Sequence, residues 1–340
     1  MLKLTVNASK IYDITIGSGL KGFNRIVNNI VSGNKIAIII DSNVYSLYGD
    51  VLDEYLSEFT VYKCVVLSGE QNKNFDNYYK LINRLAELKF NRNDAIITFG
   101  GGVVGDLGAF VASTYMRGIS LISVPTTLLS MVDSSVGGKT AIDLPAGKNL
   151  CGTFYQPDAV FINVDFLNTL PKREILSGMG EVVKYAFLDN SVSYDLIKQG
   201  VTEQLIYNCL KIKANVVEKD EKESRLRMIL NLGHTVGHAI ETLSGYTISH
   251  GECVAKGIKY AINVSQRVYN FSDDKKQRLL NLLSASGVDL TSNYDIKDIL
   301  NQIKSDKKAG DNYVNFAVIE DVGSVKIVKL YYDGIENYLC

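Results

Sequence analysis

The sequence predicts an α/β, Rossmann-like domain at the N-terminus, followed by a mainly α-helical domain. Three observations predict this order. Short runs rich in Ile and Val alternate with helical patterns through the first half, as they do in a parallel sheet covered by helices. A glycine cluster directly follows one of these runs. After about Leu170 helical patterning takes over, so we expect the domains to be residues 1–165 and 166–340.

The expected strands of the first domain are continuous apolar runs, which are typical of parallel strands buried on both faces. They are Lys35–Asp41, Thr60–Leu67, Asp94–Gly100, Ile119–Pro125 and Ala159–Asp165. The segment FDNYYKLINRLAELK, between the second and third of these strands, has apolar residues at helical spacing. In the second domain we expect helices over Thr202–Lys219, Arg225–Leu243 and Asp273–Ala285. Near the C-terminus, NFAVIEDVGSVKIVKL predicts a β-hairpin that turns at Val322–Gly323.

The composition is that of a globular protein with a large core, 46% hydrophobic and 21% charged. A formal net charge of -1 creates no global attraction to nucleic acid or membrane, so neither is expected as a partner. The five cysteines form no CxxC pair, which argues against a disulfide framework or a cysteine zinc site and favours the cytoplasm. The first residues lack the apolar core of a signal peptide, and no apolar run is long enough for a membrane span.

The run GGGVVGD at 100–106 predicts a nucleotide site, because glycines let the backbone approach a pyrophosphate and helix-start amides favour anions. Asp41 or Asn43, after an earlier strand, is placed to bind a ribose or adenine. Thr126 and Thr127 follow a later strand at the same carboxyl edge. The order departs from GxGxxG, so a tight strand-to-helix turn is the alternative.

All three histidines lie within 231–250. His234 and His238 are four residues apart, so they share a helical face and form the ligand pair that spacing alone predicts. Imidazole and carboxylate without thiolate suggest Zn²⁺ or Co²⁺ with open coordination positions. The alternative is hydrogen-bonded core histidines. In GEVVKY, Glu181 and Lys184 are three residues apart and can face one cleft, although an exposed ion pair is the commoner meaning of this spacing.

Scattered cations give a second kind of signal. Each alone is a surface charge, but together with a metal and a nucleotide they form a pocket for a small, multiply anionic substrate. They are Lys139, Lys148, Lys184, Lys213, Arg227, Lys307 and Lys308. Asp133, in MVDSSVGGK, is placed to accept hydrogen bonds from substrate hydroxyls.

A series of motifs resembles the 3-dehydroquinate synthase family, in the same order and over nearly the whole chain. The two most specific are VDSSVGGKT and NLGHTVGHAIE. The others are SGEQNK, GGGVVGD, YMRG, GKN, FLNTLP, GEVVKY, HGE and DKK. One departure is Leu232 in NLGHT, where family members often have phenylalanine. We interpret it as a packing change.

The resemblance implies the family's function, the conversion of 3-deoxy-D-arabino-heptulosonate 7-phosphate (DAHP) to 3-dehydroquinate and phosphate in the shikimate pathway of aromatic amino acid biosynthesis. The implied steps are NAD-mediated oxidation, β-elimination of phosphate, re-reduction, ring opening and intramolecular aldol closure. NAD is therefore regenerated. The resemblance also implies Zn²⁺, with Co²⁺ as the alternative, and a homodimer in which Arg117 reaches the neighbouring site.

The resemblance also implies a set of site residues. The metal ligands would be Glu181, His234 and His250, which replaces the pair expected from spacing and leaves His238 to the substrate. The other substrate residues would be Arg117, Asp133, Lys139, Asn149, Lys184, Lys213, Glu223, Arg227, Asn231 and one of Lys307 and Lys308. The NAD contacts would be Asp41, Asn43, Ser68, Gly69, Glu70, Gln71, Asn72, Lys73, Gly101, Gly102, Val103, Val104, Gly105, Asp106, Thr126, Thr127, Lys139, Lys148, Phe166, Leu167, Asn168, Thr169 and Leu170.

Three alternatives compete with this interpretation. Another sugar-phosphate cyclase, such as 2-deoxy-scyllo-inosose synthase or a sedoheptulose 7-phosphate cyclase, would share zinc, NAD and most of the chemistry. The C1 carboxylate of DAHP needs extra cations, however, and that need is met by the set of Lys213, Arg227, Asn231, Lys307 and Lys308. A metal-dependent polyol or alcohol dehydrogenase would release NADH stoichiometrically. A non-catalytic binding module would not explain metal ligands, a nucleotide loop and cations in one chain.

Overall fold

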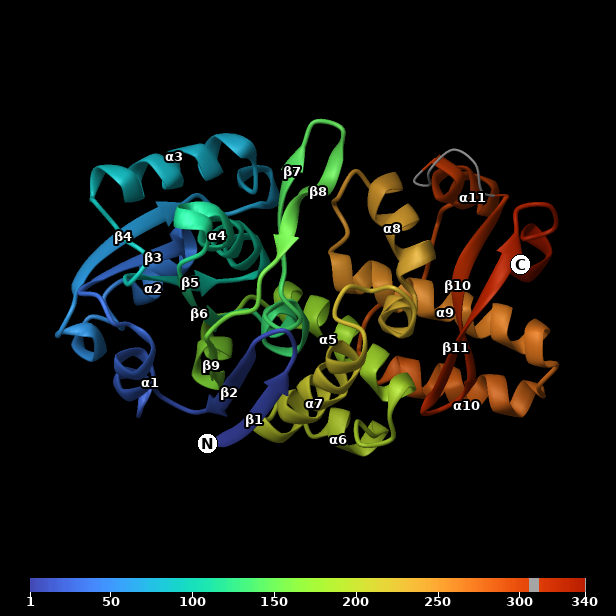
Figure 1. The fold of residues 1–340 in the computed structure, drawn as a ribbon. Helices are drawn as coiled ribbons and strands as arrows, with labels where there is room; N and C mark the ends of the chain where they lie inside the picture. Colours follow the sequence, from blue (N-terminus) through green and yellow to red (C-terminus); the bar gives the residue numbers. More distant parts are fainter. Residues whose placement is uncertain (306–311, 340) are drawn as a thin grey trace. The chain divides into compact units, whose positions relative to one another are not determined.

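The computed structural model describes residues 1–305 and 312–339. The chain divides into two compact units, Met1–Leu170 and Pro171–Cys340, which Figure 1 shows in blue to green and in yellow to red. The sequence placed the boundary at 165/166, whereas the structure places the segment 166–170 in the first unit. Lys307 and Lys308 lie outside the described residues.

A seven-stranded sheet forms the first unit, in the order β1-β2-β9-β6-β5-β3-β4. Its strands are β1 (Leu2–Asn7), β2 (Ile11–Gly17), β3 (Lys35–Asp41), β4 (Thr60–Val66), β5 (Ala95–Gly100), β6 (Ser120–Pro125) and β9 (Ala159–Asn163). Every residue of β5 and β9 is buried, which confirms the parallel strands expected from continuous apolar runs. β1 and β2 were not predicted; they pair antiparallel at one edge, where burial alternates along the strand.

Helices cover both faces of this sheet (Figure 1). They are α1 (Phe23–Ile30), α2 (Ser42–Tyr48), α3 (Phe75–Glu87) and α4 (Gly102–Thr114). Leu81 and Leu85 of α3 and Leu107 and Val111 of α4 form one buried core with the strands. A separate antiparallel hairpin consists of β7 (Lys139–Leu144) and β8 (Gly147–Phe154). Short helical turns complete the unit: η1 (Glu54–Leu56), η2 (Glu70–Asn72), η3 (Tyr115–Arg117), η4 (Ser130–Ser134) and η5 (Val164–Thr169).

The second unit is mainly helical, as predicted. Its helices are α5 (Lys172–Leu188), α6 (Tyr194–Lys198), α7 (Glu203–Lys219), η6 (Leu226–Asn231), α8 (His234–Leu243), α9 (His250–Tyr269), α10 (Asp273–Ser284), α11 (Ile296–Ser305) and α12 (Glu336–Leu339). α9 is central and contacts α5, α8, α10 and β10. The hairpin of β10 (Tyr313–Asp321) and β11 (Ser324–Tyr331) confirms the predicted turn. Gly323 adopts the left-handed conformation there, with φ 82°.

The single helix expected over Arg225–Leu243 is wrong. The short helix η6 ends at Asn231, and Gly233 then adopts φ 81° before α8 begins. A Cβ atom at Gly233 would lie 2.5 Å from the carbonyl oxygen of Val254, so the break lets α8 approach the backbone of α9. Helical periodicity continues across this break, which is why the pattern alone did not show it.

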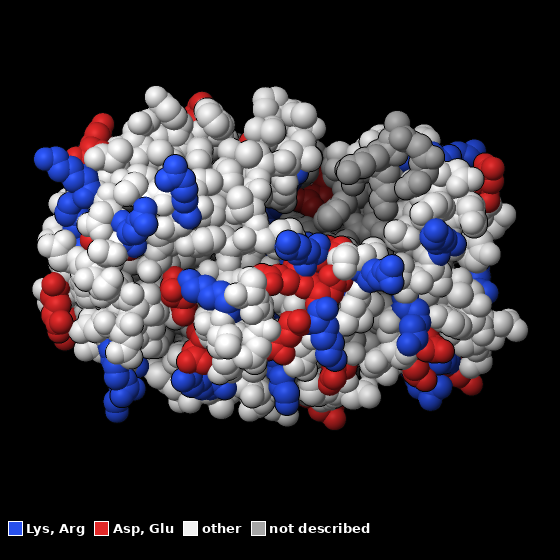
Figure 2. Space-filling model, in the orientation of Figure 1, with Lys and Arg blue, Asp and Glu red and all other residues white. Residues whose placement is uncertain are grey.

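The face drawn in Figure 2 carries Lys and Arg side chains interspersed with Asp and Glu over the second unit, in keeping with the near-zero net charge of -1. Across the described ranges, no helix combines the length and the apolar character that a membrane crossing requires.

Candidate functional site

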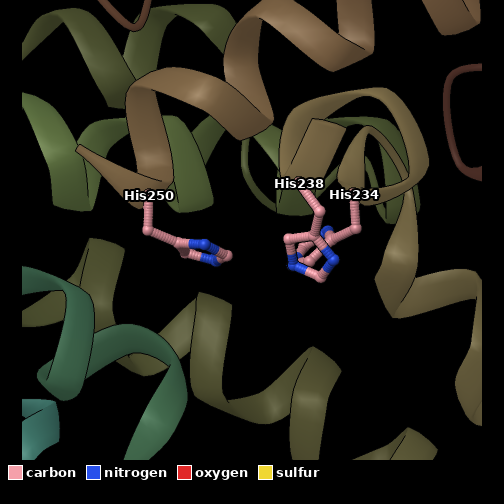
Figure 3. A group of neighbouring side chains, drawn as sticks. All are labelled: His234, His238 and His250. Atoms are coloured by element: carbon pink, nitrogen blue, oxygen red, sulfur yellow. The ribbon is translucent and has the colours of Figure 1, made fainter. Parts of the chain in front are cut away.

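Three helices of the second unit bring the predicted metal ligands together. Glu181 lies in α5, His234 is the first residue of α8, and His250 is the first residue of α9. A capping box between Ser249 and Glu252 fixes the start of α9. Figure 3 shows the imidazoles of His234 and His238 facing the same space as that of His250. One ligand atom from each of the three rings lies within 4.8 Å of the others.

Each predicted metal ligand is the chain neighbour of a glycine that touches another helix. A Cβ atom at Gly180 would lie 1.9 Å from the carbonyl oxygen of Gly251, and one at Gly251 would lie 1.7 Å from that of Ser177. Gly233 makes the contact with α9 described above. Real Cβ atoms do not approach oxygen so closely, so these positions need glycine for α5, α8 and α9 to meet.

The distances between donor atoms fit a tetrahedral ion. Oε1 of Glu181 lies 3.5 Å from Nε2 of His234 and 3.3 Å from Nε2 of His250. Bonds of 2.0–2.1 Å to a tetrahedral ion separate two of its ligand atoms by about 3.3 Å. The Glu181 side chain is 1% exposed, and its Oε2 lies 2.5 Å from Nζ of the equally buried Lys184. This carboxylate therefore has one oxygen beside the imidazoles and the other paired with a lysine.

The far nitrogen of each of these two imidazoles faces an acceptor. Nδ1 of His234 lies 3.2 Å from the carbonyl oxygen of Leu232, and Nδ1 of His250 lies 3.2 Å from Oε2 of Glu241. With a proton on Nδ1, the lone pair of each Nε2 would be available to a metal ion placed between the imidazole and Glu181, the arrangement that metal-binding histidines use. Burial lowers the pKa of His234 to about 3, so this imidazole is neutral. For His250, burial is outweighed by the hydrogen bonds to Glu181 and Glu241, which raise its pKa to about 10.

Three predicted cations among the described residues of this unit are buried, so they are not ordinary surface charges. Arg227 is 2% exposed, Lys184 is 1% exposed and Lys213 is 6% exposed. Charged side chains are rarely buried without a charged or polar partner. The Arg227 guanidinium donates to the carbonyl oxygen of Glu221, and Oε1 of Glu223 accepts from Nδ2 of Asn231 at 2.7 Å. The structure therefore pairs two of the predicted substrate residues, Glu223 and Asn231, with each other.

Asp220 fixes the turn that carries these residues. Its carboxylate accepts hydrogen bonds from the backbone N–H groups of Ser224, Arg225 and Arg227. These bonds favour the ionised carboxylate and hold its pKa well below the usual range.

In the first unit, the glycine run has the geometry of an anion site. β5 ends at Gly100, Gly101 is the N-cap of α4, and the N–H of Thr126 donates to the carbonyl of Gly100 at 3.0 Å. The first amides of a helix have no partner within it, so those of α4 are available to a phosphate. A cavity beside this turn is lined by residues that include Gly101, Asp106, Ser134, Lys139 and Tyr155.

Lys73 joins the loop 68–73 to α4. Its ammonium lies 2.6 Å from Glu70 Oε1 and 3.3 Å from Asp106 Oδ2, and its side chain is 5% exposed. Burial opposes the charged lysine, but the attraction of Asp106 and Glu70 outweighs it and raises the pKa of Lys73 to about 12. Burial raises the pKa of Asp106 to about 6, despite the nearby lysine. Asn72 Nδ2 donates to the carbonyl of Ser68 at 2.9 Å, which closes the loop.

Other members of the predicted nucleotide set hold the local fold. Asp41 caps α2 by accepting from the N–H of Asn43 at 2.8 Å. Phe166 is buried, with its ring 4.9 Å from that of Tyr48. Thr169 Oγ1 lies 2.7 Å from the Tyr48 hydroxyl.

Several predicted site residues have a left-handed backbone although they are not glycine. The φ angles are 64° at Arg117, 57° at Asn149 and 58° at Glu223. This conformation costs roughly 1–2 kcal/mol per residue, and such strain gathers at functional sites. Among the remaining residues, Asp133 lies in η4, Lys139 begins β7, and Lys148 lies in β8 beside Asn149.

Sequence reasoning missed three acids: Glu241 and Asp220 in the second unit, and Asp143 in the first. Glu241 was within reach, because it ends the motif NLGHTVGHAIE one helical turn after His238. Asp220 and Asp143 left no comparable signal, since their contacts depend on turns that periodicity does not predict.

Family models match most of the chain. The model described as 3-dehydroquinate synthase N-terminal matches residues 63–177, and that described as 3-dehydroquinate synthase C-terminal matches residues 178–309. A 3-dehydroquinate synthase from Clostridium acetobutylicum is 39% identical over 341 residues, covering 96% of this chain and 96% of that protein. One from Geobacillus thermodenitrificans is 40% identical, covering 100% of this chain and 97% of that protein.

Among solved structures, 2-deoxy-scyllo-inosose synthase in complex with carbaglucose-6-phosphate, NAD⁺ and Co²⁺ has a similar fold. Its TM-score is 0.89 at 25% sequence identity, and the match covers 99% of each chain. This cyclase is more distant in sequence than the two synthases.

Proposed function

This chain belongs to the 3-dehydroquinate synthase family, and we propose that it converts DAHP to 3-dehydroquinate and phosphate with the help of NAD and a divalent metal ion. NAD is assigned to the glycine turn and the loop 68–73 of the first unit. The metal, zinc or cobalt, is assigned to Glu181, His234 and His250 of the second. A solved relative of the same fold was crystallised with NAD⁺ and Co²⁺, which supports both assignments.

One observation carries the metal assignment. The two imidazoles that approach Glu181 Oε1 to 3.5 Å and 3.3 Å each have an acceptor 3.2 Å from Nδ1. The ligand set that the resemblance implies therefore has both the spacing and the outer hydrogen bonds of a metal site. His238 lies in the same cluster, with its ring centroid 5.3 Å from that of His234 and 5.6 Å from that of His250, and the resemblance assigns it to the substrate.

When bound, NAD would supply reversible hydride transfer, and the metal ion would act as a Lewis acid toward substrate hydroxyls. The protein's own residues bind and orient the substrate. The buried cations Lys184, Lys213 and Arg227 attract its carboxylate and phosphate groups. Asp133 and Asn149 would bind substrate hydroxyls. His238 would move protons, because a neutral imidazole is both acceptor and donor near pH 7.

A homodimer is part of the proposal. Arg117 is exposed, and its left-handed backbone directs the short turn η3. An exposed arginine in a fixed turn suits a residue that reaches the site of a second copy. One of Lys307 and Lys308 is assigned to substrate binding, and this assignment rests on the DKK motif alone.

The test is phosphate release from DAHP by the zinc-loaded protein with trace NAD⁺, coupled to detection of 3-dehydroquinate. Stoichiometric phosphate without net NADH is the expected result. If the protein instead cyclised glucose 6-phosphate or sedoheptulose 7-phosphate and left DAHP unchanged, its function would be that of another sugar-phosphate cyclase. Stoichiometric NADH would favour a dehydrogenase.

A further inference from the structure

Asp143 contacts residues of both the predicted nucleotide set and the predicted substrate set within the first unit. It lies near the end of β7, where the ladder with β8 shifts register between Ile142 and Leu144. Its backbone N–H donates to the carbonyl of Lys73 at 2.7 Å, and a parallel bridge pairs it with Asn74. The β7–β8 hairpin is therefore fastened to the loop that carries Lys73.

The carboxylate of Asp143 contacts both Asn149 and Lys73. Its Oδ1 accepts a hydrogen bond from the N–H of Asn149 at 2.8 Å and lies 3.8 Å from Nζ of Lys73. The Asp143 side chain is 18% exposed and that of Lys73 is 5% exposed, so water screens their attraction only weakly. Asn149 has φ 57°, a conformation that a residue other than glycine keeps only when its surroundings hold it.

Lys73 extends this connection to the helix after the glycine turn. Its ammonium also contacts Glu70 and Asp106, the latter in the second turn of α4. Because three carboxylates share one ammonium, removing one of them changes the position of the lysine and its attraction to the other two.

We infer that Asp143 is a positioning residue that couples nucleotide binding to substrate binding, by holding Lys73 on one side and the backbone of Asn149 on the other. The inference rests on the proposed function, in which Lys73 belongs to the NAD site and Asn149 to the substrate site. Asp143 acts through these two neighbours. Loss of the Asp143 carboxylate therefore weakens the binding of both NAD and DAHP, while kcat changes less.

Two substitutions separate the contacts. Asp143→Asn keeps an oxygen for the Asn149 N–H but removes the charge that faces Lys73, whereas Asp143→Ala removes both. Asp13→Ala is the matched control, because Asp13 also lies in a hairpin of the first unit and pairs with Lys3 at 2.8 Å. The dissociation constant for NADH is measured from its fluorescence, and KM for DAHP from phosphate release, with the full-length zinc-loaded chain. Thermal unfolding checks that each variant is folded.

We expect Asp143→Ala to raise both the NADH dissociation constant and KM about tenfold or more, the usual effect of losing a hydrogen bond to a charged group. Asp143→Asn raises the dissociation constant for NADH but leaves KM for DAHP within about twofold of wild type. Asp13→Ala changes neither the dissociation constant nor KM. A folded Asp143→Ala protein with both constants unchanged, or with effects no larger than those of Asp13→Ala, overturns the inference. A wild-type chain that binds no NADH would instead overturn the nucleotide proposal on which the inference rests.

Discussion

Removing single imidazoles distinguishes the two possible ligand pairs, His234 with His250 and His234 with His238. Metal binding at a structural zinc site is worth about 10–16 kcal/mol over four ligands, so one ligand contributes about 2.5–4 kcal/mol, on the order of a hundredfold to a thousandfold in affinity. Nε2 of His250 is 3.3 Å from Oε1 of Glu181, at the spacing of a shared ion. His250→Ala should therefore weaken zinc binding by at least about a hundredfold. His238→Ala should change it by less than about tenfold.

The assay is competition between the metal-stripped protein and a chromophoric chelator, with Co²⁺ absorption as a second readout of the ligand field. Turnover cannot make this distinction, because we expect both variants to lose it. His238→Ala should keep the wild-type Co²⁺ spectrum while its turnover falls by about 10²–10⁴-fold, the usual contribution of proton transfer. Equal loss of metal from both variants would refute the ligand assignment by making His238 a ligand beside His250. Wild-type affinity in His250→Ala would refute it and favour the pair that spacing predicted.

Three further predictions follow from contacts within the second unit. Glu241→Ala should speed the loss of metal to excess chelator about tenfold, because His250 loses the acceptor 3.2 Å from Nδ1; Glu252→Gln, which alters only the capping box of α9, should not. Gly180→Ala should lower the free energy of unfolding by about 1–3 kcal/mol or more, since its Cβ atom would lie 1.9 Å from the Gly251 carbonyl oxygen. Gly105→Ala, in open space within α4, is its control in thermal unfolding and should be neutral or stabilising. Asp220 has a depressed pKa in the folded chain, so its contribution to stability is present above the unfolded pKa of about 3.9 and is lost as the pH falls further. Urea midpoints from pH 6 to pH 3 should therefore fall less steeply in Asp220→Asn than in wild type, and identical slopes would contradict this role.

The elements that the sequence predicted well are those whose burial is uniform. The runs that became β3, β5 and β9 have interiors that are almost entirely apolar, and the parallel sheet buries these interiors on both faces. β1 and β2 alternate, because they form an antiparallel edge, and short alternating runs are hard to separate from loops. The helix over Arg225–Leu243 failed for a different reason: Gly233 interrupts it, and only the neighbouring helix shows why a glycine is needed there.

The candidate site could likewise be predicted from the sequence only in part. Spacing along the chain groups His234 with His238, because residues four apart share a helical face. The contact between His250 and Glu181 joins helices distant in sequence, so no local pattern predicts it. The motif resemblance supplied this ligand set, and the donor distances in the structure support it.

The glycine contacts between α5, α8 and α9 determine the spacing of the proposed metal ligands Glu181, His234 and His250, which together would form a coordination cage. Main-chain atoms touch directly beside Glu181, His234 and His250, so no intervening side chain can change its rotamer and alter the spacing. The donors then differ from their bound arrangement only in their own torsions, and little conformational entropy is lost when an ion enters. Substitutions elsewhere in the core can loosen the second unit without resizing the cage. Discrimination between zinc and cobalt is thereby left to the chemistry of the ions, because a cage of fixed dimensions accepts any ion of similar radius and tetrahedral preference.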